Sequence, residues 1–407
     1  MSVDQVSAKC DDERSLLYLA ARMPELTETF VYRELFGLRK RGVDVIAGSV
    51  RPPAHFVDEA LGPLSDQTFI VYAPATLAAL PLALALHPAL ALGALLDAVR
   101  ADHSSVTSRL KHVLQAMMGI AAGWRLRGRR IKHVHVHMAH VPATVGLYLA
   151  RTVGARFSFT GHAADLFVDR AALRFKLDRA AFVACISHWH RGFYSNVAAL
   201  PADRLPIIRC SVALPDAIRP ESTEIVTVAR LVPKKGIDLL IGAFAAADVG
   251  DWTLRILGDG PERDALEALA AQLGVANRIT FEGARPHAAC LAAIAEAGLF
   301  VLQCRTAANG DMDGIPVVLM EAMAAGRAVV AGDLPAIREL IDHDHSGLLV
   351  TPNDPAALAQ AFQRLIADPA LRRKFAERAR SRIEMEFSDS VNLDRLVAVF
   401  KHVKAIA

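Results

Sequence analysis

The segment Asp313-Gly-Ile-Pro-Val-Val-Leu-Met-Glu-Ala-Met-Ala-Ala-Gly326 carries the start and stop signals of a short helix. Pro316 suits the first turn, where its missing N–H costs nothing, and Gly326 suits the left-handed position just past the end. Asp313 precedes the helix, whereas Glu321 lies more than one turn inside it. The helix N-terminus favours a phosphate. The segment therefore predicts a nucleotide-sugar pocket, and an ordinary amphipathic helix with an exposed Glu321 is the alternative.

Short apolar runs alternate with helical patterns on both sides of this segment, which predicts α/β architecture with parallel sheets. In the second half we expect buried strands at 225–229, 253–257, 278–281, 299–302, 328–331 and 348–350. In the first half we expect strands at 15–20, 43–49, 156–160 and 182–187. The pattern weakens from 202 to 220, where prolines accumulate, so a domain boundary is placed there. Two such domains in series place a cleft between them.

The composition excludes several classes of protein. With 53% hydrophobic and 22% charged residues, 407 residues supply enough material for large cores, and the formal net charge of +3 gives no reason to expect nucleic-acid binding. Five scattered cysteines without a C-x-x-C pair indicate neither a disulfide framework nor a zinc site. The first fourteen residues contain no apolar core of a secretion signal, so we expect a cytoplasmic protein.

The stretch 76–96 contains no charged residue and is rich in alanine and leucine. Its length approaches that of a membrane span, but Pro81 and Pro88 argue against one. Buried or self-packing helices are the favoured interpretation. A cluster of basic residues follows: Arg125, Arg127, Arg129, Arg130 and Lys132. Because a basic cluster beside an apolar segment suits an anionic leaflet, peripheral contact at the inner face of the plasma membrane is a second hypothesis.

The loop 24–29 follows the first expected strand, and Thr27 is the expected N-cap of a helix over 28–41. In open α/β sheets, ligands bind at the carboxyl ends of the strands. The loop lacks G-x-G-x-x-G, so a nicotinamide cofactor has no support.

Polar residues mark two further strands of the first half. His133, His135 and His137 alternate and therefore share one face of a strand. A metal site is conceivable at this spacing, but no Cys or H-E-x-x-H helix completes it, so we favour a polar strand edge that faces the pocket. His162 and Asp165 follow the end of the next strand, where catalytic residues of this architecture are found.

In the second half, Arg230 and Lys235 lie on a strand-to-helix loop, where two cations and free N–H groups can hold a diphosphate. A solvated basic loop is the alternative. Gly258 begins another such turn and permits a close backbone approach. Asp311 and Asp313 form a D-x-D pair that could hold a divalent ion. The nearby cations already supply positive charge, so we expect metal independence and no cofactor.

Taken together, these motifs resemble the family-4 retaining glycosyltransferases of the GT-B fold, in particular the exopolysaccharide and colanic-acid branch. The matching segments of the second half are Arg230-Leu-x-x-x-Lys235-Gly, Leu257-Gly-Asp-Gly-Pro, Phe281-Glu-Gly, Asp313 to Gly326 and Ser346-Gly-Leu-Leu-Val. Those of the first half are Thr27-Glu-Thr-Phe, His135-Val-His-Met and Phe159-Thr-Gly-His162-Ala-Ala-Asp165.

The resemblance implies sugar transfer from a nucleotide-diphosphate donor to a glycan or lipid-linked acceptor, with retained anomeric configuration. The implied catalytic residues are His162, Asp165 and Asp313. The implied donor-binding residues are Arg230, Lys235, Gly258, Gly314, Ile315 and Glu321. In this assignment Glu321 holds the ribose, Asp313 holds the donor sugar, and His162 lies near the anomeric carbon. The family's E-x7-E is D-x7-E here, which leaves the donor open.

The resemblance also implies two facing Rossmann-like domains. We expect an acceptor-side domain over 1–205, a donor domain over 206–386, and a helix over 387–407 that crosses back to the first domain. Two other classes stay open: a sugar-nucleotide epimerase of the same architecture and a non-enzymatic two-domain sugar receptor.

Overall fold

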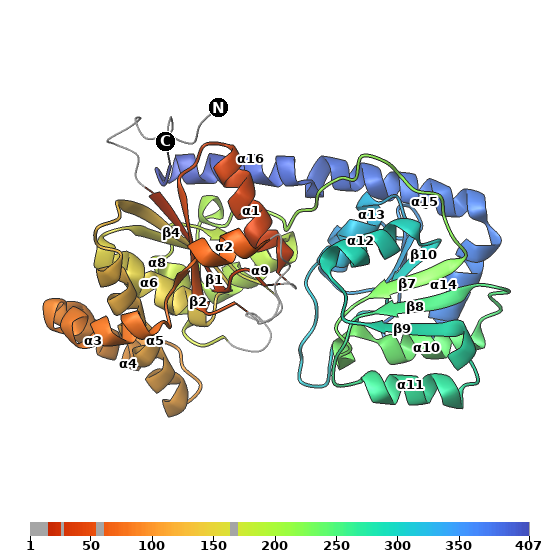
Figure 1. The fold of residues 1–407 in the computed structure, drawn as a ribbon, viewed down its shortest axis with the longest axis horizontal. Helices are drawn as coiled ribbons and strands as arrows, with labels where there is room; N and C mark the ends of the chain where they lie inside the picture. Colours follow the sequence, from red (N-terminus) through yellow and green to blue (C-terminus); the bar gives the residue numbers. More distant parts are fainter. Residues whose placement is uncertain (1–14, 26–27, 54–60, 163–169, 407) are drawn as a thin grey trace.

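The computed structural model describes residues 15–25, 28–53, 61–162 and 170–406. Two parallel sheets lie side by side, each covered by helices, and a long helical segment near the C-terminus runs along both of them (Figure 1). The expected N-cap Thr27 and the candidate Asp165 lie outside the described residues.

Within the described residues, the first sheet is six-stranded with the order β3-β2-β1-β4-β5-β6. Its strands are β1 Ser15–Arg22, β2 Val45–Arg51, β3 Phe69–Ile70, β4 Ile131–His137, β5 Arg156–Thr160 and β6 Val183–Ala184. The second sheet, also six-stranded, has the order β12-β11-β10-β7-β8-β9. Its strands are β7 Glu224–Val228, β8 Thr253–Leu257, β9 Ile279–Gly283, β10 Leu299–Leu302, β11 Val329–Gly332 and β12 Leu348–Val350. All ladders are parallel.

The helices of the first domain are α1 Thr29–Lys40, α2 Gly62–Gln67, α3 Pro74–Leu86, α4 Pro88–Arg100, α5 Val106–Arg125, α6 Val141–Val153, α8 Leu173–Arg179 and α9 His188–Val197. Those that follow are α10 Ile237–Ala246, α11 Arg263–Gln272, α12 His287–Glu296, α13 Val317–Ala324, α14 Pro355–Ala367, α15 Pro369–Arg382 and α16 Asp389–His402. Short 3-10 turns are η3 Ala202–Arg204, η4 Pro233–Lys235, η5 Ala276–Arg278 and η6 Ile337–Glu339, and a π-helical turn, η7 Ile383–Phe387, joins α15 to α16.

The segment that opened the sequence analysis forms the expected short helix, α13. Pro316 is its N-cap, one position earlier than its predicted place in the first turn. Gly326 has φ +70°, as a residue just past a helix end requires.

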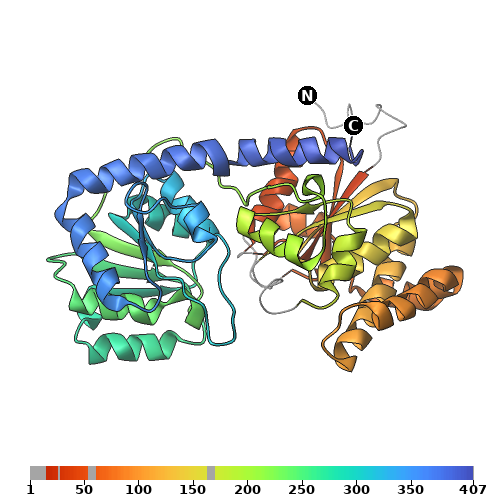
Figure 2. The same cartoon turned by 180° about the vertical axis from the view of Figure 1, so that it is seen from behind.

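The closing helix α16 packs on the first domain, which the two views of the chain show from opposite sides (Figures 1 and 2). A Cβ at Gly37 of α1 would overlap the side chain of Leu393 of α16, so this leucine packs directly against the backbone of α1. Phe400 reaches the rings of His133 and His135, whose centroids lie 5.6 and 5.3 Å from its own. The chain therefore crosses back to the first sheet. The exact domain boundaries, placed after residues 205 and 386, remain a prediction.

The helices α3, α4 and α5 project from the first domain (Figure 1). Small residues face inward, with Ala83 and Ala94 fully buried, but large apolar side chains point outward. The exposed ones are Leu77, Leu82, Leu86, Leu92, Leu95, Leu96, Val99, Val106, Leu110 and Leu114. The helices are therefore self-packing, one of the two arrangements that we favoured, but they are not buried, because many of their large apolar side chains face outward.

Among the described helices, no single one has the length and apolar composition to cross a membrane. The pair α3 and α4 meets both criteria only when joined, and the two helices meet at an angle of 98°.

Candidate active site

Asp313 lies at the centre of a charged cluster in the loop between β10 and α13. Its Oδ2 accepts hydrogen bonds from Lys235 Nζ at 2.7 Å and from Cys304 Sγ at 3.1 Å, and Lys234 Nζ lies 3.5 Å from Oδ1. Burial alone would raise the pKa of Asp313, but the two lysines and the hydrogen bonds outweigh it and lower this pKa. The carboxylate is therefore ionised at neutral pH.

The cations around Asp313 differ in their surroundings. Burial alone would lower the pKa of Lys235, but Asp313 and Cys304 raise it above its ordinary value. Lys234, a residue not predicted for the site, also contacts Asp311, with Nζ 3.0 Å from Oδ2. Arg230 is exposed two residues past the end of β7, and its guanidinium makes no hydrogen bond or ion pair within the described part of the chain. Arg230 is thus the cation of this group most available to an anion.

Gly258 brings two strand-end turns together. Its φ is +133°, and a Cβ there would overlap the carbonyl oxygen of Ala229, the residue before Arg230. The turn that contains Gly258 is also hydrogen-bonded to the Arg230 loop, because Leu231 N donates to Asp259 O at 3.0 Å. Gly258 therefore acts on the site by letting the backbone of β8 approach the Arg230 loop.

Glu321 lies at the junction between the domains. It is buried, and its Oε1 accepts a hydrogen bond from His287 Nε2 of α12 at 2.9 Å. Arg33 of α1, in the first domain, places Nη1 3.9 Å from the same oxygen. Arg33 Nη2 also donates to Ser211 O at 2.6 Å and to Asp389 Oδ1 at 3.0 Å. Glu321 and Asp313 thus have different partners: Asp313 precedes α13, and Glu321 lies inside it.

The loop at Gly314 faces the first domain. A Cβ at Gly314 would lie 3.1 Å from Cε1 of His190, in α9. Ser187 Oγ lies 2.6 Å from His190 Nδ1, whereas the buried Nε2 has no hydrogen-bond partner within the described residues. Burial lowers the pKa of His190 to about 4, so the ring is neutral. Ile315, next in the loop, is buried in an apolar cluster that spans both domains.

The N-terminus of α9 is also held by the second domain. Glu339 accepts hydrogen bonds from the backbone N–H groups of His188 at 2.8 Å and Trp189 at 2.7 Å. Arg209 Nη1 lies 3.0 Å from the same carboxylate. Together with the close approach of His190 to Gly314, these hydrogen bonds hold α9 against the loop that contains Asp313 and Gly314.

His162 lies just past the end of β5 and is buried. Its Nε2 is 3.2 Å from His137 Nδ1, and its Nδ1 is 4.0 Å from Cys210 Sγ in the interdomain connection. Burial first, and then neighbouring His137, His190 and His140, hold the pKa of His162 well below its ordinary value. The ring is therefore neutral at pH 7.

The three alternating histidines of β4 share one face, as predicted, but that face is not a pocket edge. All three are fully buried, and Phe400 of α16 packs on the rings of His133 and His135. His133 Nε2 and His135 Nδ1 lie 2.6 and 2.7 Å from Ser158 Oγ. The side chains of α16 that cover them were not part of the local pattern. In the described part of the chain, no group of three or more His, Cys, Asp or Glu side chains is arranged to hold a metal ion.

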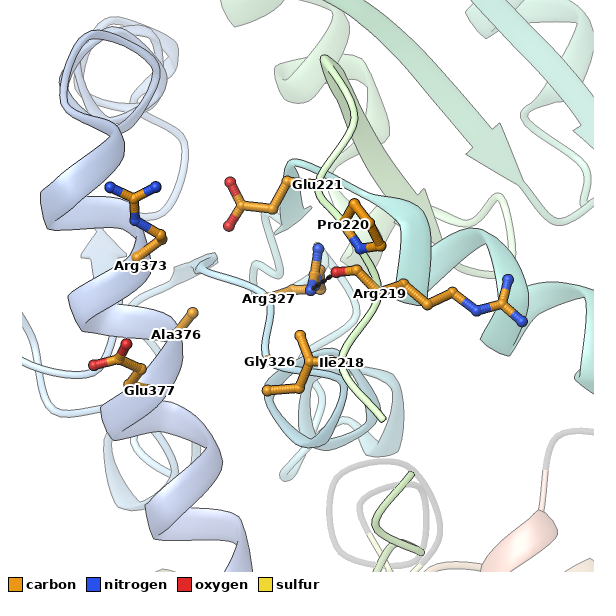
Figure 3. Close-up of a pocket in the computed structure, with 9 residues that line it drawn as sticks. All are labelled: Ile218, Arg219, Pro220, Glu221, Gly326, Arg327, Arg373, Ala376 and Glu377. Atoms are coloured by element: carbon orange, nitrogen blue, oxygen red, sulfur yellow. Dashed lines mark hydrogen bonds between the residues drawn. The ribbon is translucent and has the colours of Figure 1, made fainter. Parts of the chain in front are cut away.

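Two cavities help to delimit the site. One of about 290 Å³ lies at the carboxyl end of the first sheet and includes residues of the predicted ligand loop. It is lined by Ala21, Arg22, Glu25, Glu28, Val50, Arg51, His140, Val141 and Pro142. The other, of about 350 Å³, lies between α15 and the segment 218–221 (Figure 3). Arg327 donates to Arg219 O there at 2.8 Å, and none of the predicted site residues lines it.

Sequence patterns did not identify four of these residues. Lys234 was visible only as the neighbour of Lys235, and no motif marks Arg33, His190 or His287. Each of the last three reaches the site through a contact between segments far apart in the chain.

Two facing parallel α/β domains, with a closing helix that returns to the first, define the GT-B class of glycosyltransferase folds. The solved structure of Anabaena HepE in complex with UDP and glucose matches 96% of this chain and 100% of its own, with a TM-score of 0.70 and 17% identity. This likeness establishes the fold.

The second domain matches a family model: residues 215–382 match that of the glycosyl transferases group 1. The putative colanic acid biosynthesis glycosyltransferase WcaL of Escherichia coli is 36% identical over 202 residues, which cover 47% of this chain and 49% of WcaL. The amylovoran biosynthesis glycosyltransferase AmsK of Erwinia amylovora is 32% identical over 212 residues, which cover 50% of this chain and 52% of AmsK. The matches thus span about half the length of these relatives. The chain carries a glycosyl transferases group 1 domain.

Proposed function

We propose that this protein is a family-4 retaining glycosyltransferase that moves a sugar from a nucleotide-diphosphate donor to a glycan or lipid-linked acceptor in surface or exopolysaccharide biosynthesis. The observation that carries the proposal is the pair of Lys234 and Lys235 on Asp313, with the exposed Arg230 near enough to Lys235 to act on its pKa, in the domain that matches the group 1 family. The names of WcaL and AmsK support the pathway.

The cluster suits a diphosphate leaving group. As the glycosidic bond breaks, the diphosphate gains negative charge, so cations that are already in place stabilise the transition state more than the ground state. Arg230 is exposed to receive the anion, and Asp313 keeps Lys235 protonated within the same cluster. The nucleotide sugar is a substrate, and the proposal includes neither a metal nor another cofactor.

Asp313 stands at the position where the family that the chain resembles has a glutamate. In this structure both of its oxygens face the lysine pair, and Oδ2 is already engaged by Lys235 and Cys304. A glutamate would extend one methylene further from the backbone. We therefore assign Asp313 to ordering the cations and expect its contact with the donor sugar to be indirect.

The remaining candidates take roles around this centre. Glu321, held by His287 and near Arg33, binds the ribose hydroxyls in this proposal. His162 approaches the anomeric carbon from the first domain, and the cavity of about 290 Å³ receives part of the acceptor. Closure of the two domains over the donor excludes water, which competes as an acceptor.

The test is incubation with UDP- and GDP-sugars and a lipid-linked oligosaccharide acceptor, followed by NMR of the products. Transfer with retained anomeric configuration supports the proposal. Isomerised nucleotide sugar formed without any acceptor would instead identify an epimerase. Binding of free sugars without any response to nucleotides would identify a receptor.

Peripheral membrane contact is the second part of the proposal. The exposed leucines of α3 and α4 form an apolar face, and Arg125 Nη1 donates to Thr76 Oγ1 at 2.7 Å, which ties the basic cluster to the start of α3. Apolar side chains beside basic ones are the combination that binds an anionic leaflet. The expected location is the inner face of the plasma membrane.

Sedimentation with anionic liposomes at low salt tests this contact. We expect wild type to sediment and the double variant Leu82→Ser/Leu92→Ser to remain in the supernatant. Leu273→Ser, which changes an exposed leucine of the second domain, is the control and should sediment like wild type. Failure of wild type to sediment would end the membrane proposal.

A further inference from the structure

A cavity of about 570 Å³ lies at the amino end of β5 and is lined by residues of α6 and α8 and by Val403, which follows α16. Its volume exceeds those of the other two cavities and is within the range of small-molecule sites. Arg156 is the first residue of β5, whereas His162 lies just past its last. The cavity is therefore at the opposite end of this strand from the proposed site of sugar transfer.

Arginines dominate the lining of this cavity. They are Arg151 of α6, Arg156 of β5, Arg179 at the end of α8 and Arg204 of η3. Among the described residues that line the cavity, Asp178 is the single acid. Asp97 of α4 does not line it but pairs with two of the arginines, at 2.8 Å from Arg151 Nη1 and 3.8 Å from Arg179 Nη2. Positive charge is therefore in excess around the cavity.

Each of the four guanidinium groups keeps donors that the protein does not use. Within the described part of the chain, each forms hydrogen bonds through only one of its three nitrogens. Arg151 Nη1 donates to Asp97 Oδ2, and Arg156 Nη1 donates to Val403 O. Arg179 Nη1 donates to Phe175 O, and Arg204 Nη2 donates to three carbonyl groups at and just past the end of α8. These bonds hold the side chains in place and leave the other N–H groups to a ligand.

Bringing these cations together costs free energy. Burial lowers the pKa of Arg179, Asp97 opposes this effect, and Arg151 lowers the pKa further. The Arg179 guanidinium is thus both poorly solvated and close to a second cation. An anion with more than one negative charge offsets both effects. Phosphate has this charge, and its oxygens match the paired N–H groups of guanidinium.

We propose that this cavity is a binding site for a phosphate group, held by Arg151, Arg156, Arg179 and Arg204. Two sources carry this chemistry: a soluble phosphate compound and the headgroup of an anionic phospholipid. Asp97 connects the cavity to α4, whose exposed leucines belong to the proposed membrane face, so the headgroup source rests on the proposed function. The soluble source does not depend on it.

The first arm of the test is titration calorimetry of the full chain with inorganic pyrophosphate. Arg156→Gln removes an exposed guanidinium, and we expect it to weaken binding about tenfold. Ala155→Asp keeps the four arginines and adds a negative charge to the lining, so we expect at least the same loss. Arg230→Gln, in the proposed donor site, should leave this binding event unchanged. The matched control is Arg364→Gln, an arginine of the second domain that pairs with Asp344 and should bind like wild type.

The second arm is sedimentation with vesicles of phosphatidylcholine mixed with phosphatidylglycerol. If a headgroup fills the cavity, Arg156→Gln and Ala155→Asp sediment less than wild type, and pyrophosphate releases wild type from the vesicles. If a soluble compound fills it, both variants sediment like wild type although they have lost affinity for pyrophosphate. Either result supports the phosphate site and names its source.

The proposal is overturned if both variants match wild type in both arms, or if wild type binds neither pyrophosphate nor vesicles. Loss of pyrophosphate binding in Arg230→Gln but not in Arg156→Gln would also overturn it, because the phosphate would then lie in the donor site. An Arg156→Gln protein that does not fold leaves Ala155→Asp to decide. Wild type that transfers no sugar or fails to sediment contradicts the proposed function, and the pyrophosphate titration still tests the cavity.

Discussion

The replacement Asp313→Asn keeps the shape of the side chain but removes the charge that two lysines share. In wild type, Lys235 Nζ is 2.7 Å from Oδ2 and Lys234 Nζ is 3.5 Å from Oδ1. Side-chain exposure is only 13% for Lys235 and 8% for Lys234, so solvent screens neither strongly. The variant therefore leaves two poorly solvated ammonium groups with less negative charge.

The expected loss is about 2 kcal/mol of unfolding free energy at pH 7. Removing one partner of a fully buried ion pair costs roughly 3–5 kcal/mol. The loss is smaller here because Lys234 keeps Asp311, 3.0 Å away, and because the amide oxygen of the new Asn can still accept a hydrogen bond from Lys235.

The dependence on pH follows from the lowered pKa of Asp313, which burial alone would raise but the lysines bring down. A carboxylate whose folded pKa lies below its unfolded value of about 3.9 adds stability above that unfolded value, and this stability is lost as the pH falls through the folded pKa. The difference between wild type and Asp313→Asn should therefore be complete at neutral pH and shrink as the solution becomes more acidic than about pH 4.

Urea unfolding of both proteins, followed by circular dichroism from pH 7 to pH 3, measures this difference. Asp333→Asn, which disrupts the exposed pair with Arg338, is the control and should change the unfolding free energy little. A difference for Asp313→Asn that stays constant with pH would show that charge is not its cause. A difference near zero at pH 7 would show that the cluster is not held by this carboxylate.

Two further predictions concern the contacts between the domains. Gly314→Ala places a methyl group 3.1 Å from His190 Cε1, so we expect a loss of about 1 kcal/mol in unfolding free energy and weaker donor binding. The control Gly192→Ala, where nothing lies within 4 Å of the added Cβ, should show neither loss in the same titration. Arg33→Ala removes hydrogen bonds to the connecting segment and to Asp389, so we expect a loss of about 2 kcal/mol by urea unfolding. An Arg33→Ala protein as stable as wild type would show that this junction contributes nothing.

The parallel sheets could be predicted well from the sequence. The strands expected at 156–160, 253–257, 299–302 and 348–350 coincide with β5, β8, β10 and β12, because strands covered on both faces are continuous apolar runs with clear ends. The Asp313, Lys235 and Arg230 segments could also be placed, since each follows the carboxyl end of a strand in one sheet.

The sequence pattern could not predict which element covers each face of a strand or helix. Alternation places His133, His135 and His137 on one face of β4, but only tertiary packing decides that Phe400 of α16 covers that face. The same limit applies to α3 and α4, whose composition resembles that of buried helices although many of their leucines are exposed. A local pattern of apolar and polar residues shows which side chains of an element share a buried face, but it does not show which other element covers that face.

The partners of Glu321 were also beyond local patterns. The helix start and the acidic residue inside it could be predicted, but His287 and Arg33 arrive from other helices, one of them in the other domain. Contacts of this kind depend on how the domains pack and leave no periodic signal in either segment.

The most direct test of a nucleotide-sugar site in the second domain is the thermal unfolding of wild type and Glu321→Ala with a panel of UDP- and GDP-sugars. A ligand at a hundred times its dissociation constant stabilises the folded protein by about 2.7 kcal/mol. We predict a raised midpoint for wild type with at least one donor, a much smaller increase for Glu321→Ala, and an increase like that of wild type for the control Glu296→Ala, an exposed acid on α12. An increase that is undiminished in Glu321→Ala, or no increase with any nucleotide sugar, would contradict the assignment of the site.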